Sequence, residues 1–199
     1  MGPIGVLAPA TTANLGPGFD CLGMALDLWN RIDVTSGPSI DMSGPVVEIS
    51  GEGAGELATG DDNLVHRAMA FLFSEADREM PPVRIRCHNE IPLARGLGSS
   101  AAAISGGLVA ANEMCSQLFS PNELLEMAAT IEGHPDNVAA SVLGGLQLVV
   151  KDGQQLFTAP INIPPEIHAV LFIPEDRIAT ADARSVLKRE VSLEDAVFN

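Results

Sequence analysis

Hydrophobic and polar residues alternate most regularly between residues 81 and 92. Val83, Ile85 and Cys87 fall on one face of this segment, and charged or polar residues stand between them. A period of two is that of a β-strand with one buried and one exposed face. The segment therefore predicts a half-exposed strand that leads directly into the glycine-rich stretch beginning at Pro92.

Residues 61–77 show the spacing of a helix instead. Asp61 or Asp62 is placed to cap its start, and four apolar residues share one face: Leu64, Ala68, Phe71 and Leu72. Short aspartate side chains accept hydrogen bonds from the free N–H groups of a first turn, and a three-to-four-residue spacing gathers apolar side chains on one side. We expect an amphipathic helix here.

A second helix is predicted to begin at Ser120 and to end near Gly133. Ser120, Pro121 and Glu123 form the pattern of a capping box with proline at the first helical position. Short apolar stretches elsewhere predict strands, at residues 4–8, 46–50, 147–150 and 167–174, the last followed by a loop and the start of a helix. Such an alternation indicates a mixed α/β or α+β fold.

Two polar segments interrupt this pattern. The first strand breaks into a loop of small residues that contains Asn14 and Asp20, followed by an amphipathic stretch with Trp29. Asn and Asp among glycines commonly do no more than form turns. A knot of polar residues, His134, Asp136 and Asn137, lies before the predicted strand at 147–150.

The stretch from Pro92 to Ala103, PLARGLGSSAAA, carries the clearest chemistry. Gly96 and Gly98 can adopt positive φ, so that successive N–H groups point into one concavity. Ser99 and Ser100 begin an alanine-rich segment, and the start of a helix favours an anion. The stretch is not a Walker A loop, because it lacks the G-K-[ST] ending. The alternative is a plain strand-to-helix turn with serine caps.

Composition narrows the class of protein. The chain has 199 residues, enough for one large domain or one and a half small ones, and no apolar run reaches the length of a membrane span. The start lacks the basic region of a signal peptide, and three cysteines share no metal-ligand spacing, so we expect a cytoplasmic protein with reduced thiols. A net charge of −15 argues against nucleic acid and anionic membranes as partners. It does not exclude bound phosphates, because salt screens remote charges.

Five ordered segments resemble one family, the GHMP small-molecule kinases, and within it the homoserine kinase branch. They are APATTANLGPGFDCLG, PLARGLGSSAAA, IEGHPDNVAAS, TADAR and the ending DAVFN. The resemblance implies an α+β fold of two domains: residues 1–165 would form an ATP-binding domain with a left-handed β-α-β crossover, and residues 166–199 the start of a ferredoxin-like second domain. Homoserine kinases continue beyond this point, so we expect a truncated second domain.

The implied activity is ATP-dependent phosphorylation of L-homoserine, a step of threonine biosynthesis. By resemblance, Asn14, Asp20, Asn137 and Arg184 would bind homoserine, with Asp20 on the amino group and Arg184 on the carboxylate. Asn63 and the phosphate loop would bind ATP; the loop comprises Pro92, Leu93, Ala94, Arg95, Gly96, Leu97, Gly98, Ser99, Ser100, Ala101 and Ala102. Ser100 and Glu126 would hold Mg²⁺.

Asn137 and Asp136 are the catalytic candidates. Asp136 is the carboxylate of the polar knot that could act as a base, but the homoserine branch is thought to work by positioning alone, with Asp136 holding the turn that aims Asn137. Two other functions stay open: an inactive nucleotide-binding fragment, or a GHMP kinase of another small alcohol. A homodimer is a possible assembly.

Overall fold

The computed structural model of the chain describes most of its length: residues 2–37, 40, 43–44, 46–153, 155–177, 180–187 and 190–198. Asn199, the last residue of the DAVFN segment, lies outside this part. The strands are β1 (Ile4–Leu15), β2 (Gly18–Ser36), β3 (Val47–Gly51), β4 (Val83–Asn89), β5 (Leu146–Asp152) and β6 (Gln155–Ile161). The helices are α1 (Leu64–Glu75), α2 (Ser99–Met114), α3 (Pro121–Glu132), α4 (Asp136–Leu143), α5 (Thr180–Ser185) and α6 (Leu193–Phe198).

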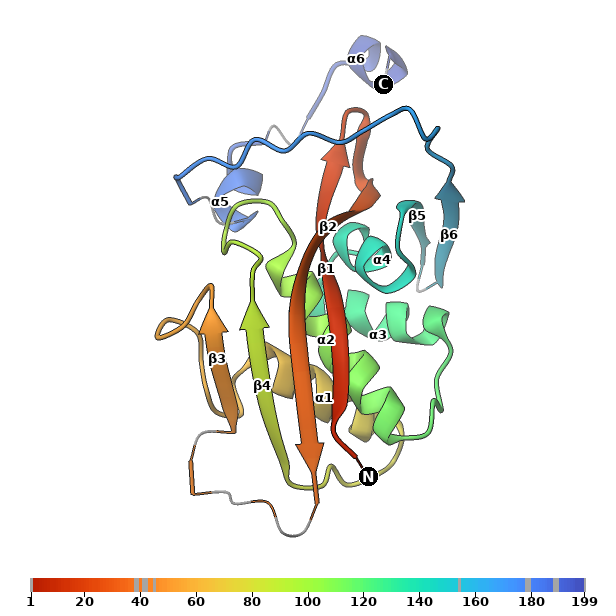
Figure 1. Ribbon diagram of the computed structural model, residues 1–199. Coiled ribbons are helices and arrows are strands. Elements are labelled where there is room, and N and C mark those ends of the chain that lie inside the picture. Colours follow the sequence, from red (N-terminus) through yellow and green to blue (C-terminus); the bar gives the residue numbers. More distant parts are fainter. Residues whose placement is uncertain are drawn as a thin grey trace.

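In the described part of the chain, six strands form one sheet organised around the 19-residue β2. β1 pairs antiparallel with β2 along nearly its whole length, whereas β4 pairs with residues 31–36 of β2 and β5 with residues 22–24. A strand has two edges and β1 occupies one, so β4 and β5 share the other at opposite ends of β2. Figure 1 shows the resulting arrangement, with β3 and β4 on one side and β5 and β6 on the other.

The parallel strands β3 and β4 are connected through α1 by a left-handed crossover. Figure 1 shows both strands pointing upward, with β4 to the right of β3 and the helices behind the sheet. A chain that passes behind the sheet and returns on the right turns left-handedly, which is rare among such connections. The crossover implied by the resemblance is therefore present.

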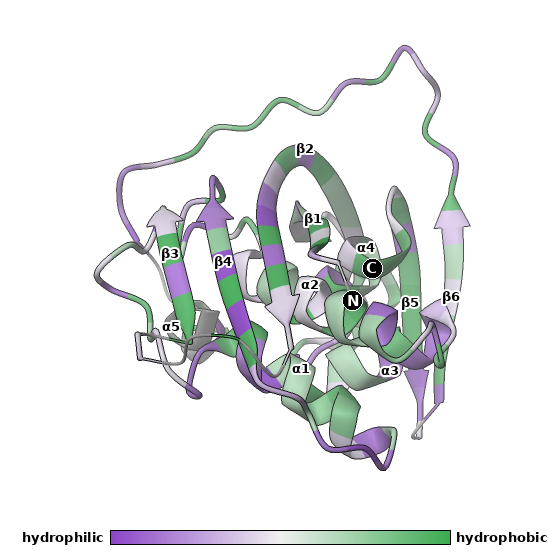
Figure 2. Ribbon diagram, turned by 60° about the horizontal axis from the view of Figure 1, so that its bottom comes forward, coloured by the Kyte–Doolittle hydropathy of each residue, from purple (hydrophilic) through white to green (hydrophobic). Residues whose placement is uncertain are grey.

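One layer of helices covers one face of the sheet and encloses the core. The alternation in β4 is confirmed, because Val83, Ile85 and Cys87 are buried and the residues between them are not; Figure 2 shows the alternating bands along this strand. Fully buried side chains from sheet and helices meet in this core: Ile32, Val34, Met69, Leu72, Leu108 and Leu125. Packing of apolar faces from both layers is the main source of stability.

The predicted helix limits are confirmed more closely for α3 than for α1. Both hydrogen bonds of the capping box between Ser120 and Glu123 are present in α3, and Gly133 in the left-handed conformation ends it. α1 is capped by Asn63 rather than by Asp61 or Asp62, because the Asn63 side chain accepts the N–H of Val65. The helix therefore begins slightly later than the aspartates suggested.

The strand predicted at residues 167–174 is wrong. Residues 162–177 form no helix or strand, and the side chains of Val170 and Phe172 are each 93% exposed. An apolar stretch becomes a strand only where another strand offers hydrogen bonds, and none of the described residues lies beside it as a partner strand. Arginine contacts hold the chain against the first 165 residues instead: Arg177 pairs with Glu56 at 2.8 Å, and Arg95 donates to the carbonyl of Pro174.

Candidate active site

A cleft of about 480 Å³ opens where the glycine-rich stretch meets the start of α1 and the turn before α4. Its volume is in the range of small-molecule sites. Asn63, Asn137 and residues 92–100 of the phosphate loop all contribute to its walls. Ala101 and Ala102 do not line it, because they are fully buried in the first turn of α2.

The phosphate loop has the conformation of an anion cradle. Ala94, Gly96 and Gly98 have φ values of 55°, 69° and 64°, so the chain changes direction repeatedly before α2 begins. Gly98 is the N-cap of α2 and provides no side chain to occupy the first N–H groups of this 16-residue helix. These donors and the positive end of the helix dipole face the cleft, which suits phosphate oxygens.

Asn63 supports the wall of the cleft from inside. Its Oδ1 accepts the N–H of Val65, and its Nδ2 donates to the carbonyl of Ala58 at 2.7 Å. Both ends of the amide are therefore engaged in shaping the loop before α1. This arrangement favours a nucleotide contact made by the loop that Asn63 holds over one made by its own side chain.

The carboxylate beside Ser100 is Glu132, not Glu126. Ser100 Oγ donates to Glu132 Oε1 at 2.6 Å, and the Glu132 side chain is 11% exposed. Glu126 lies six residues earlier on α3, about 9 Å along the axis, and faces a separate hollow beside Phe119 and Lys151. The structure thus does not bring together the predicted pair of Ser100 and Glu126.

A carboxylate and a hydroxyl are suitable oxygen ligands for Mg²⁺, which commonly takes one or two carboxylates together with phosphate oxygens. Ser100 and Glu132 provide such a donor set at the mouth of the phosphate loop. Among the described residues, no group of three His, Cys, Asp or Glu side chains could hold a metal by itself. A metal at Ser100 would therefore take further oxygen ligands from outside the protein, such as phosphate oxygens or water.

The turn before α4 joins His134, Asp136 and Asn137 into one network. His134 Nδ1 lies 2.8 Å from Asp136 Oδ1, which also accepts the backbone N–H of Asn137 at 2.8 Å. Burial raises the pKa of Asp136, but the contacts with His134 and Asn137 outweigh it and leave that pKa below its ordinary value. The hydrogen bond to Asp136 raises the pKa of His134. Asp136 is 0% exposed and does not line the cleft.

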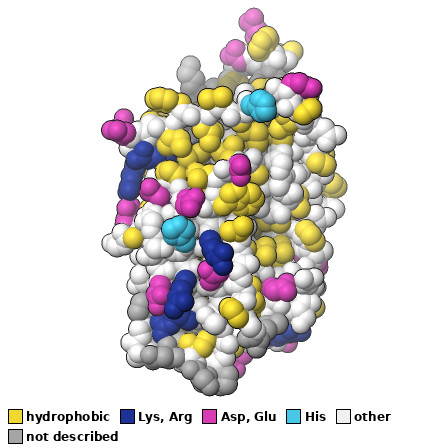
Figure 3. Space-filling view, viewed as in Figure 1, with side chains coloured by type: hydrophobic (Ala, Val, Ile, Leu, Met, Phe, Trp, Pro, Cys, Tyr) yellow, Lys and Arg dark blue, Asp and Glu magenta, His cyan; other side chains and the backbone are white. Residues whose placement is uncertain are grey.

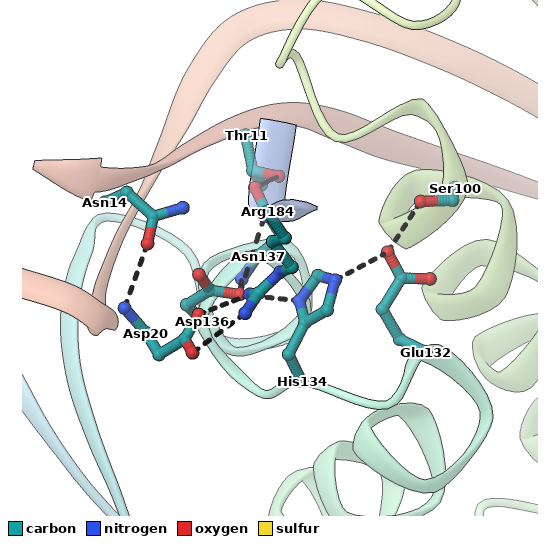
Figure 4. Close-up of polar contacts among 9 residues, drawn as sticks. All are labelled: Thr11, Asn14, Asp20, Ser100, Glu132, His134, Asp136, Asn137 and Arg184. Carbon is teal, nitrogen blue, oxygen red and sulfur yellow. Dashed lines mark hydrogen bonds and ion pairs between the residues drawn. The ribbon is translucent and has the colours of Figure 1, made fainter. Parts of the chain in front are cut away.

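Asn14, Asp20 and Arg184 lie together at one end of the site (Figure 4). Asn14 Oδ1 accepts the backbone N–H of Asp20 at 2.9 Å, across the turn between β1 and β2. Arg184 Nη1 donates to Asp20 at 3.1 Å, a second guanidinium nitrogen contacts the same carboxylate, and the guanidinium lies 5.4 Å from the ring centre of Phe19. The predicted acidic and basic substrate contacts therefore neutralise each other in this structure.

Sequence reasoning missed two residues of this site, Glu132 and Thr11. Glu132 stands inside the segment IEGHPDNVAAS, at the last position of α3, so its neighbours in the motif were the available signal. Thr11 lies on β1 inside the segment APATTANLGPGFDCLG, which was likewise the available signal, and it donates to Asn137, 126 positions away. Only the fold shows this contact.

Comparison with known proteins defines the class first. Residues 63–145 match the family described as GHMP kinases N terminal domain. The fold also resembles that of a Methanococcus jannaschii mevalonate kinase, with a TM-score of 0.61 at 15% identity, over 81% of this chain and 56% of that one. Residues 63–145 are therefore similar in sequence to the N-terminal domain of the GHMP kinases, and the fold agrees with that similarity.

Among proteins of that class, the chain is similar to the homoserine kinases. It is 45% identical to a homoserine kinase of Moorella thermoacetica over 98% of this chain and 64% of that protein, and 44% identical to one of Synechocystis over 98% and 63%. The homoserine kinase structure from Cytophaga hutchinsonii gives a TM-score of 0.80 at 29% identity, over 98% of this chain and 63% of that one. The chain thus spans somewhat less than two thirds of the length of these relatives.

Proposed function

We propose that this protein transfers the γ-phosphoryl group of ATP to the side-chain hydroxyl of L-homoserine and forms O-phospho-L-homoserine. The observation that carries the proposal is the placement of Asn137, which joins two halves of one site. On one side lie the phosphate loop and Ser100, and on the other lie Asp20 and Arg184. The homoserine kinase relatives support the same activity.

ATP would bind with its phosphates at the N-terminus of α2. The free N–H groups after Gly98 are donors to phosphate oxygens, and a 16-residue helix adds its dipole. Mg²⁺ would be held by Ser100 and Glu132 and would neutralise phosphate charge when bound. The hydrogen bond from Ser100 to Glu132 already holds these two oxygen donors next to each other at the phosphate loop.

Homoserine would bind by exchanging with the Asp20–Arg184 pair. Its ammonium group suits the carboxylate of Asp20, and its carboxylate suits the planar fork of Arg184. The side-chain hydroxyl would then extend toward Asn137 and the phosphate loop. Because each protein charge gains a partner as it loses one, a zwitterion can enter without leaving either charge uncompensated.

The chain's own residues act mainly by positioning, since phosphoryl transfer passes through a loose transition state. Asn137 borders the cleft and offers an amide to the reacting oxygens. Asp136 is buried behind it, and its lowered pKa makes it a weak proton acceptor. This supports a role in holding the turn, with the substrate proton passing to phosphate or solvent.

Incubation of the purified chain with MgATP and L-homoserine tests the proposal. Phosphorus NMR should show a phosphate monoester that forms together with ADP and requires homoserine. MgATP binding measured by calorimetry without any product would instead favour the alternative, a nucleotide-binding fragment. The binding of Mg²⁺, a cytoplasmic location and a homodimer remain predictions. In the described residues, no helix is long and apolar enough to cross a membrane.

A further inference from the structure

Thr11 lies where the phosphate loop and the turn before α4 meet. The residue is 0% exposed on β1, and its backbone N–H donates to the carbonyl of Leu97 at 3.0 Å. Its hydroxyl donates to Oδ1 of Asn137 at 2.9 Å. A single strand residue therefore contacts both the loop expected to bind phosphates and the side chain expected to face the reacting oxygens. Figure 4 shows Thr11 beside Asn137.

The phosphate loop packs directly against this hydroxyl. A Cβ built on Gly98 would lie 1.9 Å from Thr11 Oγ1 and 3.2 Å from the Thr11 carbonyl oxygen. No side chain can fit between them, so the loop and β1 keep a fixed separation. The position of the Thr11 hydroxyl is consequently tied to the position of the helix start at Gly98.

Thr11 and Asp136 together decide which way the amide of Asn137 points. The Thr11 hydroxyl is at Oδ1, and Nδ2 lies 3.5 Å from Asp136 Oδ1. The reversed amide would place Oδ1 against a carboxylate that cannot donate a proton, so it is disfavoured. Nδ2 carries two N–H groups and at most one turns toward Asp136. The other is left for a ligand in the cleft, whose wall Asn137 forms.

We propose that Thr11 is a positioning residue of the phosphoryl-transfer site. Its hydroxyl holds Oδ1 of Asn137 so that an Nδ2 hydrogen-bond donor faces the cleft, from a strand anchored to the phosphate loop. The inference rests on the proposed function and deepens it, because it fixes Asn137 as a donor rather than an acceptor. The donor suits an oxygen of the substrate hydroxyl or of the transferred phosphoryl group.

Kinetics separate this role from a purely structural one. Thr11→Val keeps the shape and removes the hydroxyl, and it should lower kcat by roughly 10- to 100-fold, as expected for a misplaced catalytic group. KM for ATP should change by less than about threefold, because the backbone contact to Leu97 is retained. Thr11→Ser should restore most of the rate. Thr12→Val, on the opposite face of β1, is the matched control and should behave like the wild type.

A double-mutant cycle identifies Asn137 as the residue through which Thr11 acts. In an Asn137→Ala background, Thr11→Val should cost no more than about twofold in kcat, since the amide that it orients is already gone. An equal loss in both backgrounds, or full activity of Thr11→Val in the wild-type background, would overturn the proposal.

The side-chain amide of Asn137 gives a readout that needs no turnover. Its NMR resonances are assigned by their loss in Asn137→Ala, and they should move in Thr11→Val but stay near the wild-type positions in Thr11→Ser and Thr12→Val. Resonances that do not move in Thr11→Val would overturn the positioning role whatever the kinetics. If they move but the wild-type chain does not phosphorylate homoserine, the proposed function fails and the positioning of Asn137 stands.

Discussion

At Gly98 the phosphate loop requires a residue without a side chain for two separate reasons. The backbone has a positive φ of 64°, and a Cβ would overlap the Thr11 hydroxyl at 1.9 Å. Gly96 shares the first reason, with a φ of 69°, but has nothing within 4 Å of its Cβ position. Substitution of Gly96 therefore tests backbone strain alone, whereas substitution of Gly98 tests backbone strain together with steric overlap.

We predict that Gly98→Ala weakens MgATP binding strongly, because the loop must move away from β1 to admit the new methyl group. Gly96→Ala should lower the free energy of unfolding by only about 1–2 kcal/mol, the cost of holding alanine at a positive φ. Urea unfolding and calorimetric titration with MgATP measure the two effects. Equal losses of affinity in both variants would show that contact with Thr11 does not shape the cradle.

Cys87 is a second residue whose chemistry follows from its surroundings. It lies on β4 with 4% of its surface exposed, and burial raises the pKa of its thiol from 9.0 to about 11. Because the folded pKa lies above the unfolded one, the neutral thiol favours the folded state fully below pH 9.0, and this contribution is lost as the pH rises toward 11.

The free energy of unfolding should therefore fall between pH 9 and 11 more steeply in the wild type than in Cys87→Ala. The difference between the pH dependences of the two proteins cancels the contributions of the other titrating groups. In the native state at neutral pH, a thiol reagent should react with the half-buried Cys21 well before Cys87. Identical slopes, or rapid labelling of Cys87, would contradict the burial argument.

At the scale of elements, α3 connects a local signal with a functional position. Its capping box at Ser120 and Glu123 could be read from the sequence, because it depends on residues three apart. The last residue of the helix, Glu132, faces Ser100. What fixes the start of α3 thereby also helps to place the carboxylate at its end.

Ser120→Ala should lower the free energy of unfolding by about 1 kcal/mol, the usual cost of losing an N-cap. Ser74→Ala, at an exposed position of α1, is the matched control and should change stability little or raise it slightly, since alanine is the better helix former. Urea unfolding of both variants measures the difference. If Ser74→Ala lowers the free energy of unfolding as much as Ser120→Ala does, the loss in Ser120→Ala cannot be attributed to the N-cap.

Two glutamates of α3, Glu132 and Glu126, allow a matched test of the proposed metal site. Glu132→Gln should raise the Mg²⁺ concentration needed for half-maximal turnover and lower kcat, because it removes the charge beside Ser100. Glu126→Gln, on the same helix but facing another hollow, should leave both unchanged. A normal Mg²⁺ dependence in Glu132→Gln, with a shifted one in Glu126→Gln, would restore the assignment made from sequence.

Other elements could not be predicted because their causes lie outside the local sequence. The stretch around Trp29 belongs to the long strand β2, where Asp27 and Leu28 have no counterpart on β1 and disturb the alternation. α4 begins at Asp136 without a side-chain cap, so its start carried no signal. The apolar residues 167–174 had the composition of a strand but lack a neighbouring strand in the described part of the chain.

At the scale of the whole molecule, the fold brings together segments that are distant in sequence. Asn14, Asp20, Asn137 and Arg184 could be singled out only one by one, by resemblance, whereas the structure brings Asn14, Asp20 and Arg184 together beside Asn137, which lines the cleft. The Thr11–Asn137 contact had no sequence counterpart at all. The sequence predicts local chemistry well where the partners are close along the chain, and poorly where the sheet creates the neighbours.

Hydrophobic and charged side chains are unevenly distributed over the surface of the molecule. Figure 3 shows hydrophobic side chains gathered over the upper part of the face seen, with charged side chains around them and below. Exposed apolar residues occur on β6 and in the segment that follows it, among them Phe157, Ile161, Val170 and Phe172. The chain as a whole has a net charge of −15, so Arg95, which lines the cleft, and Arg184, which pairs with Asp20, are cations in an acidic protein.

The central claim is that one site recognises both charges of an amino-acid alcohol beside a phosphate cradle. The most direct test compares kcat/KM for L-homoserine with that for its N-acetyl and carboxamide derivatives, each of which lacks one charge. Loss of one charged hydrogen bond should lower kcat/KM by roughly 10- to 100-fold for each derivative. A neutral alcohol phosphorylated as efficiently as L-homoserine would contradict the assignment of Asp20 and Arg184.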